Sequence, residues 1–255
     1  MSELFAGLRE LGFDVRSTYH ADAILTRDFP DAVAELESIL GAVSIPLEEL
    51  VRGGGGESSN TQRMRRALAE AGWPKVNFEI EKRINDVTTQ SQTHEVDHVK
   101  HFRRSGNEVE RGQAIALEIE WNNKDPFFNR DLDNYKMLHA DGAISVGIIV
   151  TRGRSLQDGI EARIRTFVEE QQVESFDDLD RLFDLNPTRR QRQQVEKRVD
   201  KTGLSFSEVW TGFFVSDKYG PATTHWAKLE AQMERGVGSP CPIVGIGLPL
   251  SIVVD

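Results

Sequence analysis

The sequence predicts an α/β protein with a central mixed β-sheet flanked by helices. In residues 113–121, apolar side chains alternate with Glu118 and Glu120, which is the period of a strand. Residues 143–153 are nearly all apolar, as in a central strand covered on both faces. Residues 127–140 between them follow the spacing of a helix. The order along the chain is therefore strand, strand, helix, strand, helix, strand.

The first third of the chain supplies helices and a turn-rich loop. Residues 29–41 have the pattern of an amphipathic helix, and Gly41 is a suitable stop. The glycine-rich residues 53–60 predict a flexible loop, which no Gly-Lys-Ser/Thr follows, so it is not a Walker A loop. A further helix is expected over 61–72. Its candidate caps are Ser58, Ser59 and Asn60.

The central block carries the strand signals. Residues 75–82 predict a strand, followed by a polar connector to about residue 92. Residues 94–103 and 113–121 predict two antiparallel strands joined by a turn-rich segment. The helix over 127–140 ends at Gly142. Its expected buried face consists of Phe128, Leu132, Tyr135 and Leu138.

The last part of the chain is mainly helical. Residues 155–215 predict a helical insertion within a single domain spanning 1–255. Residues 221–236 predict another helix, with Thr223 or Thr224 near its start. The apolar stretch after Pro240 supplies the last strand or strands. Four tryptophans are expected in the core or at an interface: Trp73, Trp121, Trp210 and Trp226.

Composition excludes several classes of protein. No apolar run reaches the roughly 18 residues that a membrane span needs, and no secretory signal is evident at the start. The single cysteine, Cys241, excludes an internal disulfide and a multi-cysteine zinc site, which suits a reducing cytoplasm. The net charge of −10 argues weakly against nucleic-acid binding, but Arg and Lys cluster locally, as in 189–198.

Three acids form the most informative pattern. Glu118 and Glu120 point to one face of their strand, where two charges about 5 Å apart repel by about 3 kcal/mol at an effective dielectric of about 20. A cation between this pair and another acid would remove the repulsion, and Asp97 is the nearest candidate. Carboxylates suit Mg²⁺. By itself the pattern is weak, because a solvated strand face would also explain it.

The context of these acids resembles a known nuclease fold. The strand, turn, strand, helix, strand setting around Asp97, Glu118 and Glu120 resembles the core of the PD-(D/E)xK nucleases. Three segments resemble the type II restriction endonucleases of the BglII/BstYI group: TYHADAIL at 18–25, AIALEIEWNNKDPFFNRDL at 114–132, and the tail at 227–249. A longer gap between Asp97 and Glu118, and the long segment 155–215, depart from that group.

This resemblance implies roles for the acids. Asp97 and Glu118 would hold Mg²⁺, for which Mn²⁺ can substitute, and the Ile119 carbonyl would be a further ligand. Glu120 takes the place of the Lys of the wider superfamily and the Gln of this group. Whether it is a general base or only orients the attacking water stays open. Glu79 is an accessory candidate by loose analogy, with an exposed strand residue as the favoured alternative.

The candidate DNA contacts lie just after the acidic strand and near the start of the helix at 221–236. They are Asn122, Asn123, Lys124, Thr223, Thr224 and His225. The resemblance implies base reading by the first three, and Asn and Lys can contact adenine, guanine or phosphate. Residues at a helix start can donate to phosphate. The alternatives are a polar strand end and a plain helix cap.

Histidines near Asp97 raise a second metal hypothesis. On a strand, His98 would face away from Asp97, while His101 would share its side. No second ligand pair completes a tetrahedral zinc site, so we interpret His94, His98 and His101 as surface or packing residues.

The resemblance implies a Mg²⁺-dependent homodimer that cuts both strands of a short palindromic site in double-stranded DNA. The ends would be 5′-phosphate and 3′-hydroxyl, and the site would contain GATC. A companion DNA methyltransferase, a bacterial cytoplasmic location and no membrane association are expected. The alternatives are a less specific repair or recombination nuclease of the same fold and a non-catalytic DNA-binding protein.

Overall fold

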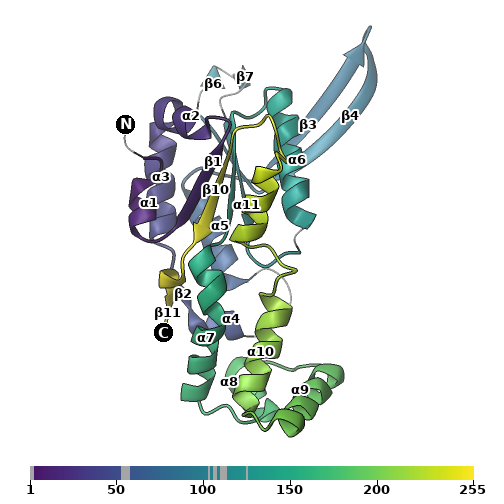
Figure 1. The fold of residues 1–255 in the computed structure, drawn as a ribbon. Helices are drawn as coiled ribbons and strands as arrows, with labels where there is room; N and C mark the ends of the chain where they lie inside the picture. The colour runs from purple at the N-terminus through teal and green to yellow at the C-terminus, as the bar shows by residue number, and fades with distance from the viewer. Residues whose placement is uncertain (1–2, 53–57, 103, 106–107, 110–113, 125) are drawn as a thin grey trace.

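A five-stranded sheet forms the centre of the chain in a computed structural model, which describes residues 3–52, 58–102, 104–105, 108–109, 114–124 and 126–255. The strand order is β1 (Asp14–Thr18), β10 (Ile243–Leu248), β9 (Val146–Arg152), β8 (Ala114–Glu120) and β5 (His98–His101). The three central strands are parallel to one another, and both outer strands are antiparallel to their neighbours. The expected mixed sheet is confirmed (Figure 1).

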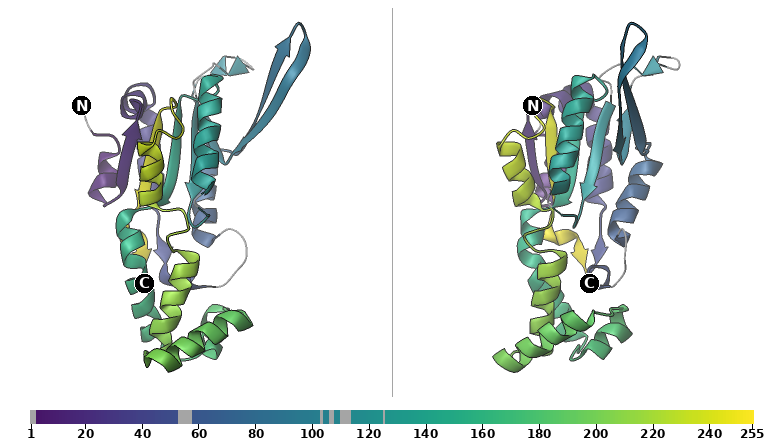
Figure 2. Two further views of the ribbon diagram at one scale, coloured as in Figure 1. Left: turned by 45° about the vertical axis from the view of Figure 1, so that its right-hand side comes forward. Right: turned by 90° about the vertical axis from the view of Figure 1, so that its right-hand side faces the viewer.

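Helices cover both faces of this sheet (Figures 1 and 2). The hydrophobic core on one side includes side chains from α1 to α5, and the core on the other side is formed largely by α6 and α11. Ile115, Leu117 and Ile119 of β8 join the first core, whereas Ala114 and Ala116 join the second. Glu118 and Glu120 share the second face, as the alternation predicts. The bounds of these helices are α1 (Ala6–Glu10), α2 (Ala21–Asp28), α3 (Pro30–Gly41), α4 (Leu47–Val51), α5 (Ser59–Glu70), α6 (Pro126–Ala140) and α11 (Trp226–Glu234).

Helix α6 lies very close to the sheet. A Cβ added at Gly147 of β9 would lie 2.2 Å from the Tyr135 ring, so only glycine fits there. The Tyr135 hydroxyl donates a hydrogen bond to the Ile148 carbonyl at 2.8 Å. Phe128, Leu132, Tyr135 and Leu138 are all buried, which confirms the predicted helix face. The sequence therefore positions α6 tightly over β9, which is the neighbour of the strand that carries the two glutamates.

The polar connector expected after residue 82 is instead a strand. β3 (Val76–Ile84) and β4 (Val87–Val96) form a long antiparallel hairpin that projects from the body (Figure 2). Cross-strand hydrogen bonds keep this polar segment extended although it buries little, so no apolar alternation marked it. The expected strand over 94–103 is divided between β4 and β5. Beyond it lie β6 (Arg104–Ser105) and β7 (Glu108–Val109).

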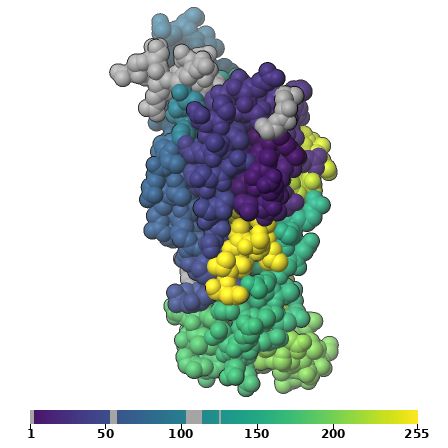
Figure 3. Space-filling view, turned by 90° about the vertical axis from the view of Figure 1, so that its left-hand side faces the viewer, coloured from purple at the N-terminus to yellow at the C-terminus, as the bar shows by residue number. Residues whose placement is uncertain are grey.

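Residues 154–218 form a helical extension beyond one end of the sheet, which is the lowest part of the molecule in Figures 1 and 3. It contains α7 (Arg154–Glu170), α8 (Phe176–Phe183), α9 (Arg189–Thr202) and α10 (Phe206–Lys218), as the helical patterns predict. The chain then returns through α11 and β10 and ends with the 3₁₀ turn η1 (Leu250–Ile252) and β11 (Val253–Val254), which pairs with β2 (Ile45–Pro46). Among the described residues, no helix is long and apolar enough to span a bilayer.

Two helix starts differ from expectation. The helix predicted at 221–236 begins only at Trp226, because Thr223 before it pairs with Lys124, just beyond the end of β8. The helix expected over 61–72 is α5, which begins at Ser59, and its cap residue is Ser58, one of the three candidates, although the Ser58 side chain makes no capping hydrogen bond. Most of the loop predicted over 53–60 lies outside the described residues. The four tryptophans are buried, as predicted.

Candidate active site

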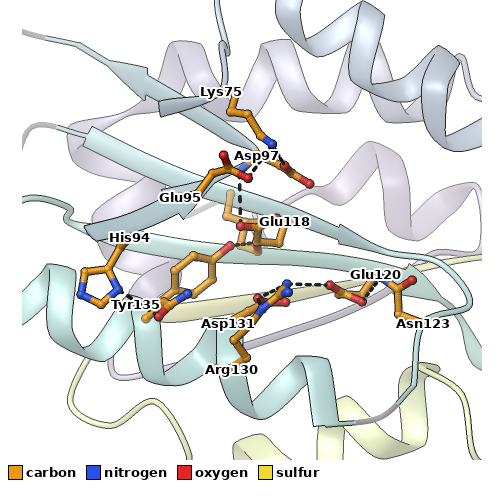
Figure 4. Close-up of polar contacts among 12 residues, drawn as sticks. Lys75, His94, Glu95, Asp97, Glu118, Glu120, Asn123, Arg130, Asp131 and Tyr135 are labelled. Carbon is orange, nitrogen blue, oxygen red and sulfur yellow. Dashed lines mark hydrogen bonds and ion pairs between the residues drawn. The ribbon is translucent and has the colours of Figure 1, made fainter. Parts of the chain in front are cut away.

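A cavity of about 670 Å³ opens beside the carboxyl end of β8. Asp97 reaches it from the bend between β4 and β5, and Glu118 and Glu120 reach it from β8. Helix α6 contributes Arg130 and Asn134 to its wall. The three predicted acids therefore line one cavity although they are distant in sequence (Figure 4).

Glu118 is buried with little compensation for a negative charge. Its carboxylate accepts a hydrogen bond from the backbone N–H of Asp97 at 3.2 Å. Burial, followed by the neighbouring Asp131 and Asp97 carboxylates, raises the pKa of Glu118 to about 9. A cation that enters the cavity would therefore stabilise the negatively charged form of Glu118.

Glu120 belongs to a small polar cluster between β8 and α6. Asn123 donates from its amide to the Glu120 carboxylate at 2.6 Å, and the Arg130 guanidinium lies 3.5 Å from it. Arg130 also pairs with Asp131 at 2.7 Å. Burial and the Asp131 carboxylate raise the pKa of Glu120 to about 8. The cluster fixes the Glu120 carboxylate in place (Figure 4).

Asp97 has a different environment. Its side chain is one-third exposed and lies 3.3 Å from Lys75 Nζ, which also pairs with Glu95. Arg65 lies 3.9 Å from the same carboxylate oxygen. These surface cations balance the charge of Asp97, whereas the cation beside the deeper pair is Arg130, which lies 3.5 Å from the Glu120 carboxylate.

The acids suit a divalent cation. Their oxygens are hard ligands, and Oδ2 of Asp131 is buried without a hydrogen-bond partner. Within the described ranges, no three His, Cys, Asp or Glu side chains form a ready-made metal cluster. Mg²⁺ is commonly held by only one or two carboxylates together with waters and substrate phosphate, so this donor set still fits such an ion.

The candidate DNA contacts are brought together from two distant segments. Lys124 and Thr223 form an antiparallel bridge, and the Thr224 N–H donates to the Asn123 carbonyl at 2.7 Å. Asn123 and Lys124 are exposed and Asn122 is half-buried, so these three can reach a ligand. His225 is half-buried at the cap position of α11.

Thr223 and Thr224 face the interior and not an exposed helix start. Both are buried, and the Thr223 hydroxyl donates to the Gly220 carbonyl and accepts from Arg152. Arg152 is also buried and donates to the Thr224 carbonyl at 2.8 Å. Burial lowers the pKa of Arg152 to about 10. The two threonines therefore hold the 123–124 segment in place.

The remaining candidates lie elsewhere. Glu79 is exposed on the β3–β4 hairpin opposite Thr93 and does not line the acidic cavity. His94 and His98 are buried and contact Asn134 and the Trp73 carbonyl, respectively, as packing residues would. The structure thus brings Asp97, Glu118 and Glu120 together and leaves Glu79 apart.

Asp131 is the residue that the sequence reading missed. It is 1% exposed and lies on the buried stripe of α6, three residues after Phe128 and four before Tyr135. A charged residue within an apolar helical stripe is a signal, because buried carboxylates are rare without a partner. Its neighbour Arg130 gives no such signal, because an exposed arginine on a helix surface is ordinary.

Comparison with known proteins agrees with this geometry. The family model described as restriction endonuclease BglII/BglIII matches residues 13–248, nearly the whole chain. No curated protein matches the chain with significant similarity. The matched region contains the central sheet, the acidic cavity and the helical extension. The chain therefore belongs to the BglII/BglIII family of restriction endonucleases, which are type II site-specific deoxyribonucleases.

Proposed function

We propose that this endonuclease acts as a Mg²⁺-dependent homodimer that cuts both strands of a short palindromic DNA site. The observation that carries the proposal is the convergence of Asp97, Glu118 and Glu120 on one cavity. A two-fold symmetric protein matches a two-fold symmetric site, so each subunit would cut one strand. The products would carry 5′-phosphate and 3′-hydroxyl ends.

The acids divide into two roles in this proposal. Asp97 and Glu118, with the Ile119 carbonyl, would hold the cation. When bound, the cation would supply positive charge that stabilises the transition state at the scissile phosphate. Asp97 would have to share its charge between the cation and Lys75, which lies 3.3 Å away. The raised pKa of Glu118 supports this assignment, since a buried acid without a counter-charge favours cation binding.

Glu120 would direct the attacking water. Its carboxylate is held by the Asn123 amide, which leaves an oxygen able to accept a hydrogen bond from water. From this position Glu120 either orients the water or takes its proton as a general base. If the water lies opposite the leaving 3′-oxygen, its in-line attack inverts the configuration at phosphorus.

The residues that recognise the DNA bases would lie directly after β8. Asn122, Asn123 and Lys124 follow Glu120 directly, and their side chains are accessible. His225 is a further candidate for DNA contact. Thr223 and Thr224 would hold residues 123–124 in position through their backbone pairing with that segment. A GATC-containing site with four-base 5′ overhangs is our specific proposal. A companion methyltransferase would then protect the host sites.

Digestion of plasmid DNA tests the proposal. Wild-type protein with Mg²⁺ should give discrete fragments, and sequencing of their ends should show one palindrome with 5′ overhangs. Chelation of the metal and the Glu118→Ala substitution should each abolish cutting, while Glu118→Ala retains DNA binding. Mn²⁺ should restore cutting after chelation.

The two alternative functions have distinct outcomes in the same assay. Smeared products would indicate a nuclease with little sequence preference. Binding that is equal in EDTA and Mg²⁺, without any cleavage, would indicate a DNA-binding protein that has lost catalysis.

A further inference from the structure

Helix α9 carries an excess of positive charge in an acidic protein. Its 14 residues contain six basic and two acidic side chains, a net of +4, whereas the whole chain has a net charge of −10. At 3.6 residues per turn, Arg190, Lys197 and Lys201 lie within about 40° of one another around the helix axis. We call these three residues the α9 stripe. Both acids of the helix, Glu196 and Asp200, lie about 80° or more away from Arg190.

The α9 stripe lacks charge partners among the residues that the structure describes. All three side chains are exposed, and in the part of the chain that the structure describes none of them forms an ion pair. Lys197 and Lys201 are four residues apart on one face, a spacing at which like charges destabilise a helix slightly. Other cations of the same extension do have partners, since Arg163, Arg165 and Arg181 pair with Asp255, Glu161 and Asp178.

The helix holds this stripe rigidly. Thr188 and Gln191 form a reciprocal capping box at its start, and Gly203 ends it with φ 68°. Val195 is buried beneath the helix, and Arg192 lies over the Phe176 ring at 4.9 Å. The cations are therefore presented from a fixed support on the side opposite to these contacts.

A groove connects α9 with the active site. A cavity of about 570 Å³ runs between the helices of the extension and is lined by Gln191 and Gln194 of α9 and by Asn122. Asn122 also lines the acidic cavity, so the two cavities adjoin at the end of β8. Gln194 lies about 40° from Arg190 around the helix, so the stripe occupies the helix face next to the one that lines this groove, and its three residues do not line the groove themselves. In Figure 2, left, α9 and the β3–β4 hairpin project to the same side of the body.

We propose that the α9 stripe binds the phosphate backbone of the DNA duplex outside the recognition site, on the flank that leaves the active site along this groove. This inference rests on the proposed function. Uncompensated cations beside a groove complement a polyanion. From residue 190 to residue 201 the helix spans about 17 Å, which corresponds to about five base-pair steps of 3.4 Å. The contact is independent of sequence and adds affinity.

Duplex length provides the test. Once the cleavage site is known, a duplex of the site with a few flanking base pairs is compared with a long duplex that carries the same site in its centre. Binding is measured in EDTA at several salt concentrations for wild type and for the Arg190→Gln, Lys197→Gln, Lys201→Gln triple variant. We expect at least tenfold weaker binding of the long duplex by the variant, and a twofold change at most on the short one.

Salt dependence sharpens this result. Each lost phosphate contact lowers the slope of log affinity against log salt by about 0.9, so three contacts on each chain lower it by about 2.7 per chain. The matched control replaces Arg163, Arg165 and Arg181 with Gln, which removes the same charge from the same extension. It should bind both duplexes like wild type. A Lys197→Arg, Lys201→Arg variant should also keep wild-type affinity, and equal melting temperatures establish that all variants fold.

The outcomes separate the inference from the proposed function. Equal losses on both duplexes, equal losses in the control, or no loss at all would overturn the role of the α9 stripe while the enzyme still cuts. A wild-type protein that cuts no DNA of either length would overturn the proposed function, and the inference with it.

Discussion

Among the described residues, the acidic cavity and the α9 stripe both hold like charges in excess, with one arginine, Arg130, beside the buried acids and no ion-pair partner for the stripe. The two regions differ in their access to water. Glu118, Glu120 and Asp131 are buried, so their charge is costly and their pKa values rise. The stripe cations are exposed, where water and salt screen them. Buried negative charges therefore indicate a cation-binding site. Exposed positive charges indicate a surface that can bind a polyanion, and they cost the folded state little stability.

The largest expected effect comes from removing a buried acid from the catalytic reaction. Glu120→Ala should lower the cleavage rate at least about 100-fold, because a positioned general base or water-orienting group contributes roughly 10²–10⁴-fold. Cleavage rates under single-turnover conditions measure this. The matched control is Glu79→Ala, which removes an exposed acid outside the cavity and should cut at the wild-type rate. Similar rates in the two variants would remove Glu120 from the mechanism.

The next effect concerns stability without metal. Because the pKa of Glu118 is about 9 in the folded chain against 4.5 for the ordinary group, the folded state binds this proton more tightly. This contribution is fully present below about pH 4.5 and is lost as pH rises toward 9. In EDTA at pH 8, Glu118→Gln should raise the free energy of unfolding by at least about 1 kcal/mol, or the melting temperature by about 2–4 °C.

Thermal melts across pH measure this difference. The gain should shrink as the pH falls toward 4.5 and vanish below it, where Glu118 is protonated in the unfolded state as well as in the folded one. Glu81→Gln, an exposed substitution on β3, serves as control and should leave the pH profile unchanged. A Glu118→Gln variant that is less stable than wild type at pH 8 would mean that the buried charge is already compensated.

A smaller effect tests the link between Asp131 and Glu120. Asp131→Asn removes a neighbouring negative charge, so the pKa of Glu120 should fall below its present value of about 8. Carboxyl ¹³C chemical shifts, titrated by NMR without metal, report this directly. Asp133→Asn, on the exposed side of the same helix, should leave the Glu120 titration as it is. An unchanged Glu120 titration in Asp131→Asn would mean that the Asp131 charge does not raise the pKa of Glu120.

The smallest effect is expected for the stability of variants in the exposed α9 stripe. Lys197→Gln should change the free energy of unfolding by less than about 0.5 kcal/mol, because surface substitutions away from special features have small effects. Urea denaturation measures this value. A loss of more than about 1 kcal/mol would show that Lys197 has a structural partner, and the stripe would then not be available for DNA.

Sequence alone determined the parts of this protein that follow local periodicity. The alternation in β8 placed Glu118 and Glu120 on one face, and the stripe from Phe128 to Leu138 gave the buried side of α6. It also marked Asp97, since an acidic pair on a half-buried strand needs a counterpart. These features depend on the fixed geometry of strands and helices, which neighbouring residues specify.

Tertiary structure decided what depends on contacts between distant segments. The turn at Gly220–Thr224 pairs with residues 123–124, and this pairing buries Thr223 and Thr224. As a result, α11 begins only at Trp226. The polar β4 strand exists because β3 supplies its hydrogen bonds, not because it buries apolar side chains. Asp131 meets Glu120 only because Gly147 lets α6 lie against the sheet. Local sequence cannot specify such pairings, because burial and hydrogen-bond partners are set by the folded chain as a whole.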